Sequence, residues 1–409
     1  MQSTHKTKGA VRAFAVAIAL ALAILLCIFA LASCTSDDED PGRGDRPPPG
    51  DDDTGDDDSG DDDSGDDDDD DWVEPGARVE SSGDVGQYTS LELDADDNPH
   101  IVYYHEQQGL KYAAWDGSNW TIEGIDDTAP ETGKYTGFKL DEDGEAHISY
   151  YDAHNGDLKY ATGHVDEDKG SWEVVVVDGA GGDVGMYTCL DLNSDENPLI
   201  SYFDAANEDL KFARISGSAW AVETVDQDGS VGAFSSLSVD PATDAAYIAY
   251  YDADNGDLKM ADRSTGQWDV QTVDPNGDVG TWTDIRVSGI GNIYIGYCDQ
   301  ANSNLKFARR LAGEQTWIIE TLDDTAKVGA DVTIDLDSGG LPWILYQDQD
   351  FVDAKLAKRT AGGWEIEGAL TDGPFGFWMS LEIDSAGEIV FSHYYVMTKD
   401  LLIYPPRTP

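Results

Sequence analysis

Seven positions, each at the start of a strand-like segment that recurs along the chain, carry side chains that can bind a ligand. Six of them are aromatic and one is acidic: Tyr88, Tyr135, Tyr187, Phe234, Trp282, Asp331 and Trp378. Flat aromatic side chains stack on sugar rings or clamp the side chains of a peptide. The same aromatics can instead simply plug the end of each repeated segment. The sequence leaves both interpretations open.

The acidic member of this series marks where a single specific site is expected. Asp331 interrupts the aromatic pattern, and the same copy of the repeat also carries Asp348, Asp350 and Asp353. A departure from an otherwise consistent pattern is where a functional site is expected. We therefore predict ligand-binding residues in the fifth to seventh copies, with Asp331 and Asp348 among the candidates.

A second recurring series is polar and lies four positions further along the same segments. It comprises Glu92, Lys139, Asp191, Ser238, Arg286, Asp335 and Glu382. It alternates with an apolar series, Leu91, Phe138, Leu190, Leu237, Ile285, Ile334 and Leu381. Neighbouring residues of a strand point to opposite faces, so the polar series faces away from the core. We expect it to line a solvated channel, with Arg286 as a further candidate for ligand binding.

The sequence gives little support for catalysis or for a cofactor. No G-x-S-x-G, H-E-x-x-H or P-loop motif occurs, and the histidines show no zinc spacing. Carboxylates number 82, so chance pairs are inevitable and cannot nominate an acid–base pair. The run Asp252-x-Asp254-x-x-Asp257 can hold calcium, but it lacks the closing glutamate of an EF-hand loop and fits an Asn-Gly hairpin turn better. We expect a non-enzymatic protein without a metal or cofactor, calcium being the one ion left open.

The candidate residues recur because the chain repeats itself from residue 72 onward. Each copy opens on a glycine, with gaps of 47, 52, 47, 48, 49 and 47 residues between Gly86, Gly133, Gly185, Gly232, Gly280, Gly329 and Gly376. Each copy holds four short alternating or aromatic segments, such as YTGFKLD, AHISYYD, DLKYATG and WEVVVVD in the second copy. Four antiparallel strands in each of seven copies predict an all-β fold, a seven-bladed β-propeller.

The two ends of the repeat region complement each other. The last copy stops after its third segment, near Leu401 to Tyr404. The residues before the first copy, Ala77 to Glu80, align with the fourth segments of the others. We expect this N-terminal piece to be the outer strand of the last blade, because the closure removes an exposed sheet edge. Residues 72–409 are then a single domain.

Three further series are expected to build the blades. The second segments carry Tyr103, Tyr150, Tyr202, Tyr250, Tyr297, Tyr346 and, departing, His393. The fourth segments carry Trp120, Trp172, Trp220, Trp268, Trp317 and Trp364. We expect both aromatic series to pack between blades. The second segments end on Asp152, Asp204, Asp252, Asp299 and Asp348, which we expect to cap the following turns, a repeated sugar or metal ligand being the alternative.

The turn before several fourth segments has a Gly-x-Trp or Gly-x-x-Trp pattern, as in Gly117 to Trp120, Gly170 to Trp172 and Gly266 to Trp268. With the seven copies, this pattern resembles the bacterial seven-bladed propellers of the sialidase-like, or BNR (Asp-box), superfamily over about residues 72–409. The full S-x-D-x-G-x-x-W form is absent. A sialidase activity would require a cluster of arginines, and Arg286 alone belongs to a channel-facing series.

Charge excludes one large class of partners. The formal net charge is -57, so binding to nucleic acid or to a bulk anionic membrane surface is excluded. Residues 37–71 carry -18 of it with almost no apolar residues, which predicts a disordered tether that binds calcium at most diffusely.

The N-terminal residues predict export. Three cationic residues precede an apolar run from Ala13 to Ala32, which is typical of a secretory signal. The run ends in Leu31-Ala32-Ser33-Cys34, which resembles the lipobox of bacterial lipoproteins. The resemblance implies a signal peptide over 1–33, lipid attachment at Cys34, an acidic linker over 34–71 and, from the neutral Thr35, an outer-membrane location. An uncleaved transmembrane helix is the alternative.

Two cysteines, Cys189 and Cys298, lie in the repeat region. They belong to blades that are not neighbours, so we expect free, buried thiols.

These observations favour a monomeric, non-catalytic binding protein of the bacterial cell envelope, anchored to the membrane by lipid. We expect it to recognise a glycan or an envelope protein through its loop face. The alternatives are a glycosidase or lyase acting on a polysaccharide, and a structural envelope scaffold.

Overall fold

The computed structural model describes residues 76–129, 131–164, 172–179, 182–325, 327–370 and 375–405. The predicted signal peptide, Cys34 and acidic linker lie outside the described residues. Within those ranges, the structure contains no helix that is long and apolar enough to span a bilayer.

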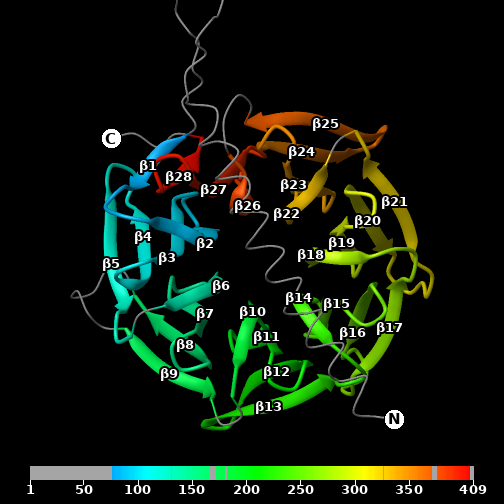
Figure 1. Ribbon diagram of the computed structural model, residues 1–409, viewed down its shortest axis with the longest axis horizontal. Coiled ribbons are helices and arrows are strands. Elements are labelled where there is room, and N and C mark those ends of the chain that lie inside the picture. The colour runs from blue at the N-terminus through cyan, green and yellow to red at the C-terminus, as the bar shows by residue number, and fades with distance from the viewer. Residues whose placement is uncertain are drawn as a thin grey trace, which may run out of the picture. The chain divides into compact units, whose positions relative to one another are not determined.

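The described residues form 28 strands in seven four-stranded antiparallel sheets, which stand in a ring as the blades of a propeller (Figure 1). The first strands, nearest the axis, are β2 (Val85–Leu93), β6 (Thr132–Leu140), β10 (Val184–Leu192), β14 (Val231–Val239), β18 (Val279–Val287), β22 (Val328–Leu336) and β26 (Phe377–Ile383). The second strands are β3 (Pro99–His105), β7 (Ala146–Asp152), β11 (Pro198–Asp204), β15 (Ala246–Asp252), β19 (Ile293–Asp299), β23 (Pro342–Asp348) and β27 (Ile389–Tyr395).

The outer half of each blade completes the predicted pattern. The third strands are β4 (Gly109–Trp115), β8 (Asp157–Gly163), β12 (Asp209–Ser216), β16 (Asp257–Asp262), β20 (Asn304–Arg310), β24 (Asp353–Thr360) and β28 (Asp400–Tyr404). The fourth strands are β5 (Trp120–Asp126), β9 (Glu173–Asp178), β13 (Ala219–Asp226), β17 (Asp269–Asp274), β21 (Ile318–Asp323), β25 (Gly363–Leu370) and β1 (Ala77–Glu80). The predicted fold class is confirmed.

The N-terminal strand closes the ring as predicted. β1 pairs antiparallel with β28, and Ala77 lies opposite Ile403. Figure 1 shows the blue first strand beside the red strands of the last blade. Arg78 Nε also lies 3.0 Å from Asp400 Oδ2 of β28. The seventh blade is therefore built from both ends of the described chain.

The glycine that opens a copy is required by contact between blades in the first six copies. Gly133 has a φ of +104°, and a Cβ atom there would lie 2.8 Å from the Cα of Leu110 in the preceding blade. Gly232 has the same φ, and its Cβ would lie 2.7 Å from the Cα of Leu210. Only glycine tolerates both the left-handed backbone and this approach, which explains the most regular feature of the sequence.

The core lies between neighbouring blades. One cluster joins Leu110 and Tyr112 of the first blade to Phe138 and Ile148 of the second. The predicted apolar series of the first strands is at most 2% exposed throughout. The outer-strand tryptophans also pack across interfaces: the Trp172 ring lies 5.3 Å from that of Tyr112. The predicted packing roles are confirmed.

A hydrogen-bonded clamp, made of a tyrosine, a carboxylate and a lysine, joins most pairs of blades. The hydroxyl of Tyr250 donates to Asp226 Oδ2 of the preceding blade at 2.7 Å, and Lys259 Nζ donates to the same oxygen at 2.5 Å. All six tyrosines of the second-strand series are fully buried. The clamp carboxylates are Glu80, Asp126, Asp178, Asp226, Asp274 and Asp323. Leu370 and His393 stand at the corresponding positions of the seventh interface.

The aspartates that end the second strands cap turns, as predicted. Asp252 Oδ1 accepts from the backbone N–H of Asn255 at 3.1 Å, and its Oδ2 accepts from the Asn255 side chain at 2.9 Å. The DADNGD run is therefore a turn whose first carboxylate is already satisfied. Asp348 is used in the same way, because its Oδ1 accepts from the backbone of Asp350 at 3.1 Å.

Both cysteines of the repeat region are free, as predicted, but they differ in burial. Cys298 is buried, and burial raises the pKa of its thiol to about 12. Cys189 is only half-buried and lines the central cavity described below, so the prediction of a buried thiol is wrong for this residue.

Acid is expected to weaken the clamps. Burial alone would raise the pKa of Asp323, but hydrogen bonds from Lys355, Thr325 and Tyr346 outweigh it and lower the pKa to about 2. The folded-state pKa lies below the ordinary value of 3.8, so the stabilisation is complete above pH 4 and is lost as the pH falls through about 2. The pKa values of other clamp carboxylates are lowered too.

We therefore expect the urea midpoint of unfolding to drop steeply between about pH 4 and pH 2. Tyrosine or tryptophan fluorescence follows the transition. A midpoint that stays constant across this interval would show that the clamp carboxylates carry no net stabilisation.

Candidate functional site

The structure brings the seven-residue series at the start of the first strands into one ring around the axis, which we call the mouth ring. Its members are Tyr88, Tyr135, Tyr187, Phe234, Trp282, Asp331 and Trp378. Neighbouring rings are in contact: the centroids of Tyr88 and Tyr135 lie 4.7 Å apart, and those of Phe234 and Trp282 lie 5.4 Å apart. Contacts of this kind run without a break from Trp282 through Tyr88 to Trp378.

A backbone irregularity turns these side chains toward one another. Every member of the mouth ring has a positive φ, from 48° at Trp378 to 55° at Phe234. The pairing register of the first strand shifts beside each residue, for example between Gln87 and Ser90 in the first blade. A left-handed backbone at a bulky residue costs about 1–3 kcal/mol and persists only where surrounding contacts impose it. The contacts of the fold therefore hold the mouth-ring residues in a backbone conformation that they would not adopt on their own.

The mouth ring has one interruption, at Asp331. This carboxylate accepts a hydrogen bond from the backbone N–H of Trp378 in the next blade. Burial raises the pKa of Asp331 to about 7, although hydrogen bonds from Trp378 and Met379 oppose the shift. A small acidic side chain therefore stands where every other blade places an aromatic ring.

A second row of aromatic residues, on the second strands, lies behind the mouth ring, and it is interrupted in the same region. Tyr104 lies behind Tyr88 with centroids 6.4 Å apart, and Tyr251 lies behind Phe234 at the same distance. In the fifth and sixth blades the corresponding positions carry Cys298 and Gln347. The break in symmetry predicted for blades five to seven is present, and it is centred on Asp331.

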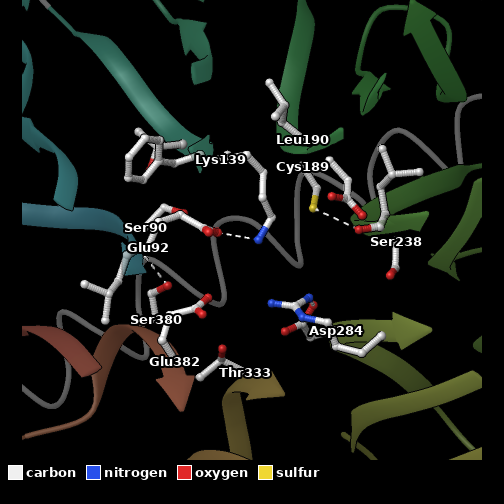
Figure 2. A pocket seen from close by; sticks show the side chains of 17 residues that line it. Ser90, Glu92, Lys139, Cys189, Leu190, Ser238, Asp284, Thr333, Ser380 and Glu382 are labelled. Carbon is white, nitrogen blue, oxygen red and sulfur yellow. Dashed lines mark hydrogen bonds and ion pairs between the residues drawn. The ribbon is translucent and has the colours of Figure 1, made fainter. Parts of the chain in front are cut away.

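Beyond the mouth ring, the first strands enclose a cavity of about 170 Å³. Six of the seven residues of the polar series predicted to line a channel line this cavity, all except Asp335: Glu92, Lys139, Asp191, Ser238, Arg286 and Glu382. Figure 2 shows Lys139 reaching across to Glu92, with which it forms an ion pair.

Both signs of charge meet in this cavity. Arg286 lies 3.1 Å from Asp284. Burial raises the pKa of Glu92, and it raises that of Glu382 well above the usual range, with further repulsion from Glu92. The cavity lining holds four acidic and two basic side chains, and the raised pKa values of Glu92 and Glu382 reduce the negative charge that the acids carry.

Several lining residues also join the blades. Ser236 Oγ donates to Asp284 Oδ1 at 2.6 Å, and Asp284 Oδ2 accepts from the backbone N–H of Ile334 at 2.9 Å. Asp191 Oδ2 accepts from the backbone N–H of Val239 at 2.7 Å. These residues position neighbouring first strands. The mouth ring takes part in similar ties, because the backbone oxygens of Tyr88 and Tyr187 accept from Thr136 and Ser235 of the next blade.

The predicted site residues separate into three places. Six of them, Tyr88, Tyr135, Tyr187, Trp282, Asp331 and Trp378, share the mouth ring. Arg286 lies in the cavity, on the same strand as Trp282. Asp348 lies apart from both: its carboxylate caps a turn and stands 3.9 Å from Lys355 Nζ.

A further cavity-lining series, which was not predicted from the sequence, lies two residues before the predicted polar series on the first strands. Ser90, Cys189, Asp284, Thr333 and Ser380 line the cavity beside the predicted set. The signal was present, because residues two apart on a strand share a face. It was obscured because small and apolar members interrupt it, such as Gly137.

Comparison with known proteins establishes the fold but no family. A comparison with protein-family models finds no match, and a comparison with curated proteins finds none either. A polysaccharide lyase described as an ulvan lyase, bound to -[GlcA(1-4)Rha3S]-, superposes with a TM-score of 0.54 at 13% identity, over 81% of this chain and 92% of that chain.

Two further solved structures are also similar. A triple mutant of AofleA from Arthrobotrys oligospora gives a TM-score of 0.51 at 15% identity, over 72% of this chain and 94% of that one. The six-bladed Aleuria aurantia lectin, described with a fucose recognition mode, gives 0.48 at 15% identity, over 73% and 97%. At these identities the likeness is one of fold alone.

Proposed function

We propose that this chain is a non-catalytic binding protein that recognises a glycan at the mouth ring, in the sector formed by Trp282, Asp331 and Trp378. The observation that carries the proposal is the single interruption of an otherwise continuous aromatic ring by a carboxylate. Such a sector offers two flat aromatic faces and one carboxyl group, on the first strands of three consecutive blades.

This combination suits carbohydrate chemistry. A pyranose ring has apolar C–H faces that stack on Trp and Tyr, while its hydroxyl groups need acceptors. Asp331 supplies carboxyl oxygens in a setting from which water is largely removed. A hydrogen bond to them is worth about 0.5–1.5 kcal/mol, and about 1.5–3 kcal/mol when the carboxyl is ionised, which its pKa of about 7 makes dependent on pH. The backbone geometry that places the three side chains is imposed by the fold, so the sector is pre-organised.

Charge narrows the class of glycan. The whole chain carries a net charge of -57, and the cavity behind the mouth ring contains more acidic than basic side chains. An anionic polysaccharide would meet repulsion from the net negative charge of the chain. We therefore propose a neutral or amino-sugar glycan as the ligand.

The comparisons support a glycan more than a protein ligand. The lyase that shares the fold is described as bound to an oligosaccharide. That likeness is one of fold, so it supports the class of ligand and says nothing about turnover in this chain.

A glycan array probed with the full-length chain tests the proposal. We expect binding to a small set of neutral or amino-sugar structures, and intact glycans by mass spectrometry after prolonged incubation. Trp282→Ala should abolish the signal, whereas Trp120→Ala on the outer strand of the first blade should leave it unchanged. Shortened or unsaturated products would show a lyase or glycosidase instead. Binding only to envelope proteins in a pull-down would show a scaffold.

We also propose that Cys34 carries a lipid that anchors the chain at the bacterial envelope, with residues 37–71 as the tether. Changing Cys34 to Ala should move the protein from the membrane fraction to the soluble fraction, because a lipid chain supplies the membrane affinity. Retention of this variant in the membrane fraction would favour an uncleaved transmembrane helix.

A further inference from the structure

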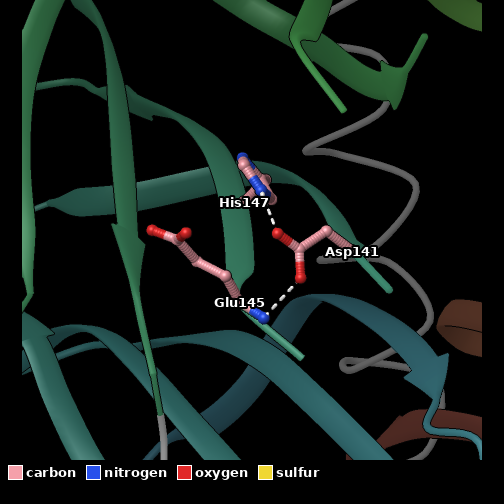
Figure 3. Close-up of side chains that lie close together, drawn as sticks. All are labelled: Asp141, Glu145 and His147. Carbon is pink, nitrogen blue, oxygen red and sulfur yellow. Dashed lines mark hydrogen bonds and ion pairs between the residues drawn. The ribbon is translucent and has the colours of Figure 1, made fainter. Parts of the chain in front are cut away.

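A cluster in the second blade, outside the mouth ring, combines ligand types that metal ions prefer. Asp141, Glu145 and His147 each offer a ligand atom, and these atoms lie within 4.8 Å of one another. Figure 3 shows the three side chains at the turn between β6 and β7. His164, just past the end of β8, lies nearby, with its Nε2 4.0 Å from Glu145 Oε2.

One nitrogen in this cluster, His147 Nε2, makes only a long ion-pair contact, with Asp141 (Figure 3). The side chain of His147 is 9% exposed, and its Nε2 forms no hydrogen bond. The nearest acidic oxygen is Asp141 Oδ2, 3.5 Å away. A buried polar atom without a hydrogen bond costs about 1–3 kcal/mol, and a bound ion would remove this cost at Nε2.

Each side chain is held by one atom and presents another to the cluster. His147 Nδ1 is 2.6 Å from the hydroxyl of Tyr160. Asp141 Oδ1 accepts from the backbone N–H of Glu145 at 2.7 Å, and Glu145 Oε1 accepts from Thr162 at 2.6 Å. Supporting contacts of this kind orient the ligands in metal sites.

The spacing fits a tetrahedral ion. Metal bonds of about 2.1 Å in a tetrahedron place neighbouring ligand atoms about 3.4 Å apart. The distances from His147 Nε2 to Asp141 Oδ2 and from His164 Nε2 to Glu145 Oε2 are 3.5 and 4.0 Å. The ligand atoms of Asp141, Glu145 and His147 lie within 4.8 Å of one another, so small side-chain movements would bring them to one ion. Mixed imidazole and carboxylate ligands select first-row transition ions over calcium and magnesium, which prefer oxygen alone.

We propose that Asp141, Glu145, His147 and His164 bind a divalent transition ion of the Zn²⁺ class. The ion ties the β6–β7 turn to the end of β8, so this is a site that stabilises the second blade and is separate from glycan binding.

The first blade provides a natural comparison. It has Asp94 and His100 at the matching positions, but Asn98 replaces Glu145 and its side chain donates to Asp94 Oδ2 at 3.0 Å. Blades three to seven carry no histidine at the position of His147; they have Leu199, Tyr247, Tyr294, Trp343 and Val390. The full ligand set therefore occurs in the second blade alone among the described residues, which is not the pattern of a residue needed to build every blade.

Calorimetric titration of the metal-free full-length chain with ZnCl₂ tests the site. The titration contains excess Mg²⁺, which occupies the carboxylates of the acidic linker. Those carboxylates bind hard cations and have no preference for zinc. We expect one saturable zinc site. Its affinity should fall more than about 100-fold in His147→Ala, since even losing a supporting contact costs 10–100-fold. The exposed His154 in the same blade supplies the matched control, and His154→Ala should bind zinc as the original chain does.

Glu145→Asn gives the second blade the asparagine that the first blade carries at this position, Asn98. This variant tests the zinc site even if His147→Ala fails to fold. It should weaken zinc binding and remove the visible absorption of tetrahedral Co²⁺ bound in place of zinc. Absence of a saturable zinc site in the unaltered chain would overturn the proposal. So would a zinc affinity in folded His147→Ala and Glu145→Asn equal to that of the unaltered chain. Neither outcome depends on whether a glycan binds.

Discussion

Deleting residues 72–82 lowers the melting temperature sharply, because it removes β1 and opens the seventh blade. The deletion exposes the backbone edge of β28 and the buried face that packs on Val79, which is 8% exposed. It also removes Glu80, which accepts from Tyr103 and Lys111, each at 2.5 Å. Differential scanning calorimetry measures the effect.

A point variant separates the clamp from the strand. The side chains of Glu80 and Lys111 are 8% and 7% exposed. Glu80→Ala leaves this lysine buried without its partner, and unpairing a buried charge costs about 3–5 kcal/mol. We expect the melting temperature to fall by about 5–10 °C. In contrast, Glu131→Ala removes an exposed ion pair with Lys134 and should change stability by less than about 1 kcal/mol. Equal effects of the two substitutions, or a deletion that leaves the melting temperature unchanged, would show that closure contributes nothing.

Asp331→Tyr abolishes glycan binding while the protein stays folded. The substitution gives the sixth blade the residue that three other blades carry at this position. The backbone already accommodates it, because φ is 50° at Asp331 and 52–53° at Tyr88, Tyr135 and Tyr187. The new ring fills the sector between Trp282 and Trp378 and removes the acceptor. We expect affinity to fall at least about 30-fold, corresponding to about 2 kcal/mol, and the melting temperature to stay within a few degrees.

Two further variants interpret the result. Trp120→Tyr on the outer strand β5 changes an aromatic residue far along the blade from the axis and should leave affinity unchanged. Asp331→Asn keeps the size of the side chain and should retain part of the binding. If Asp331→Tyr binds the glycan as the unaltered chain does, the ligand does not use this sector.

The blades could be predicted because their signals are local and repeated seven times. The opening glycines and the alternation of Leu91 with Glu92 each depend on a contact that every blade makes. The closing strand could also be predicted, because Ala77–Glu80 has the character of a fourth strand. It even supplies a clamp carboxylate, Glu80, where the other blades use aspartate.

The site was harder to predict, because its geometry depends on backbone conformation and on contacts between distant residues. Nothing in the identity of Tyr88 or Trp282 indicates a positive φ, so their convergence into one ring could not be foreseen. Spacing along the chain also concealed the second-blade cluster. His164 reaches Glu145 because β7 and β8 pair antiparallel, with Ala146 opposite Gly163. A motif search expects ligands within one turn or loop and does not find this arrangement.

The stoichiometry of glycan binding tests the central claim most directly. Isothermal titration of the full-length chain with the best glycan from the array gives the number of sites per chain. Because only the sector at Asp331 departs from the ring, we predict one site. Six or seven equivalent sites would show that each blade binds through features common to all of them, and would contradict the assignment of recognition to Trp282, Asp331 and Trp378.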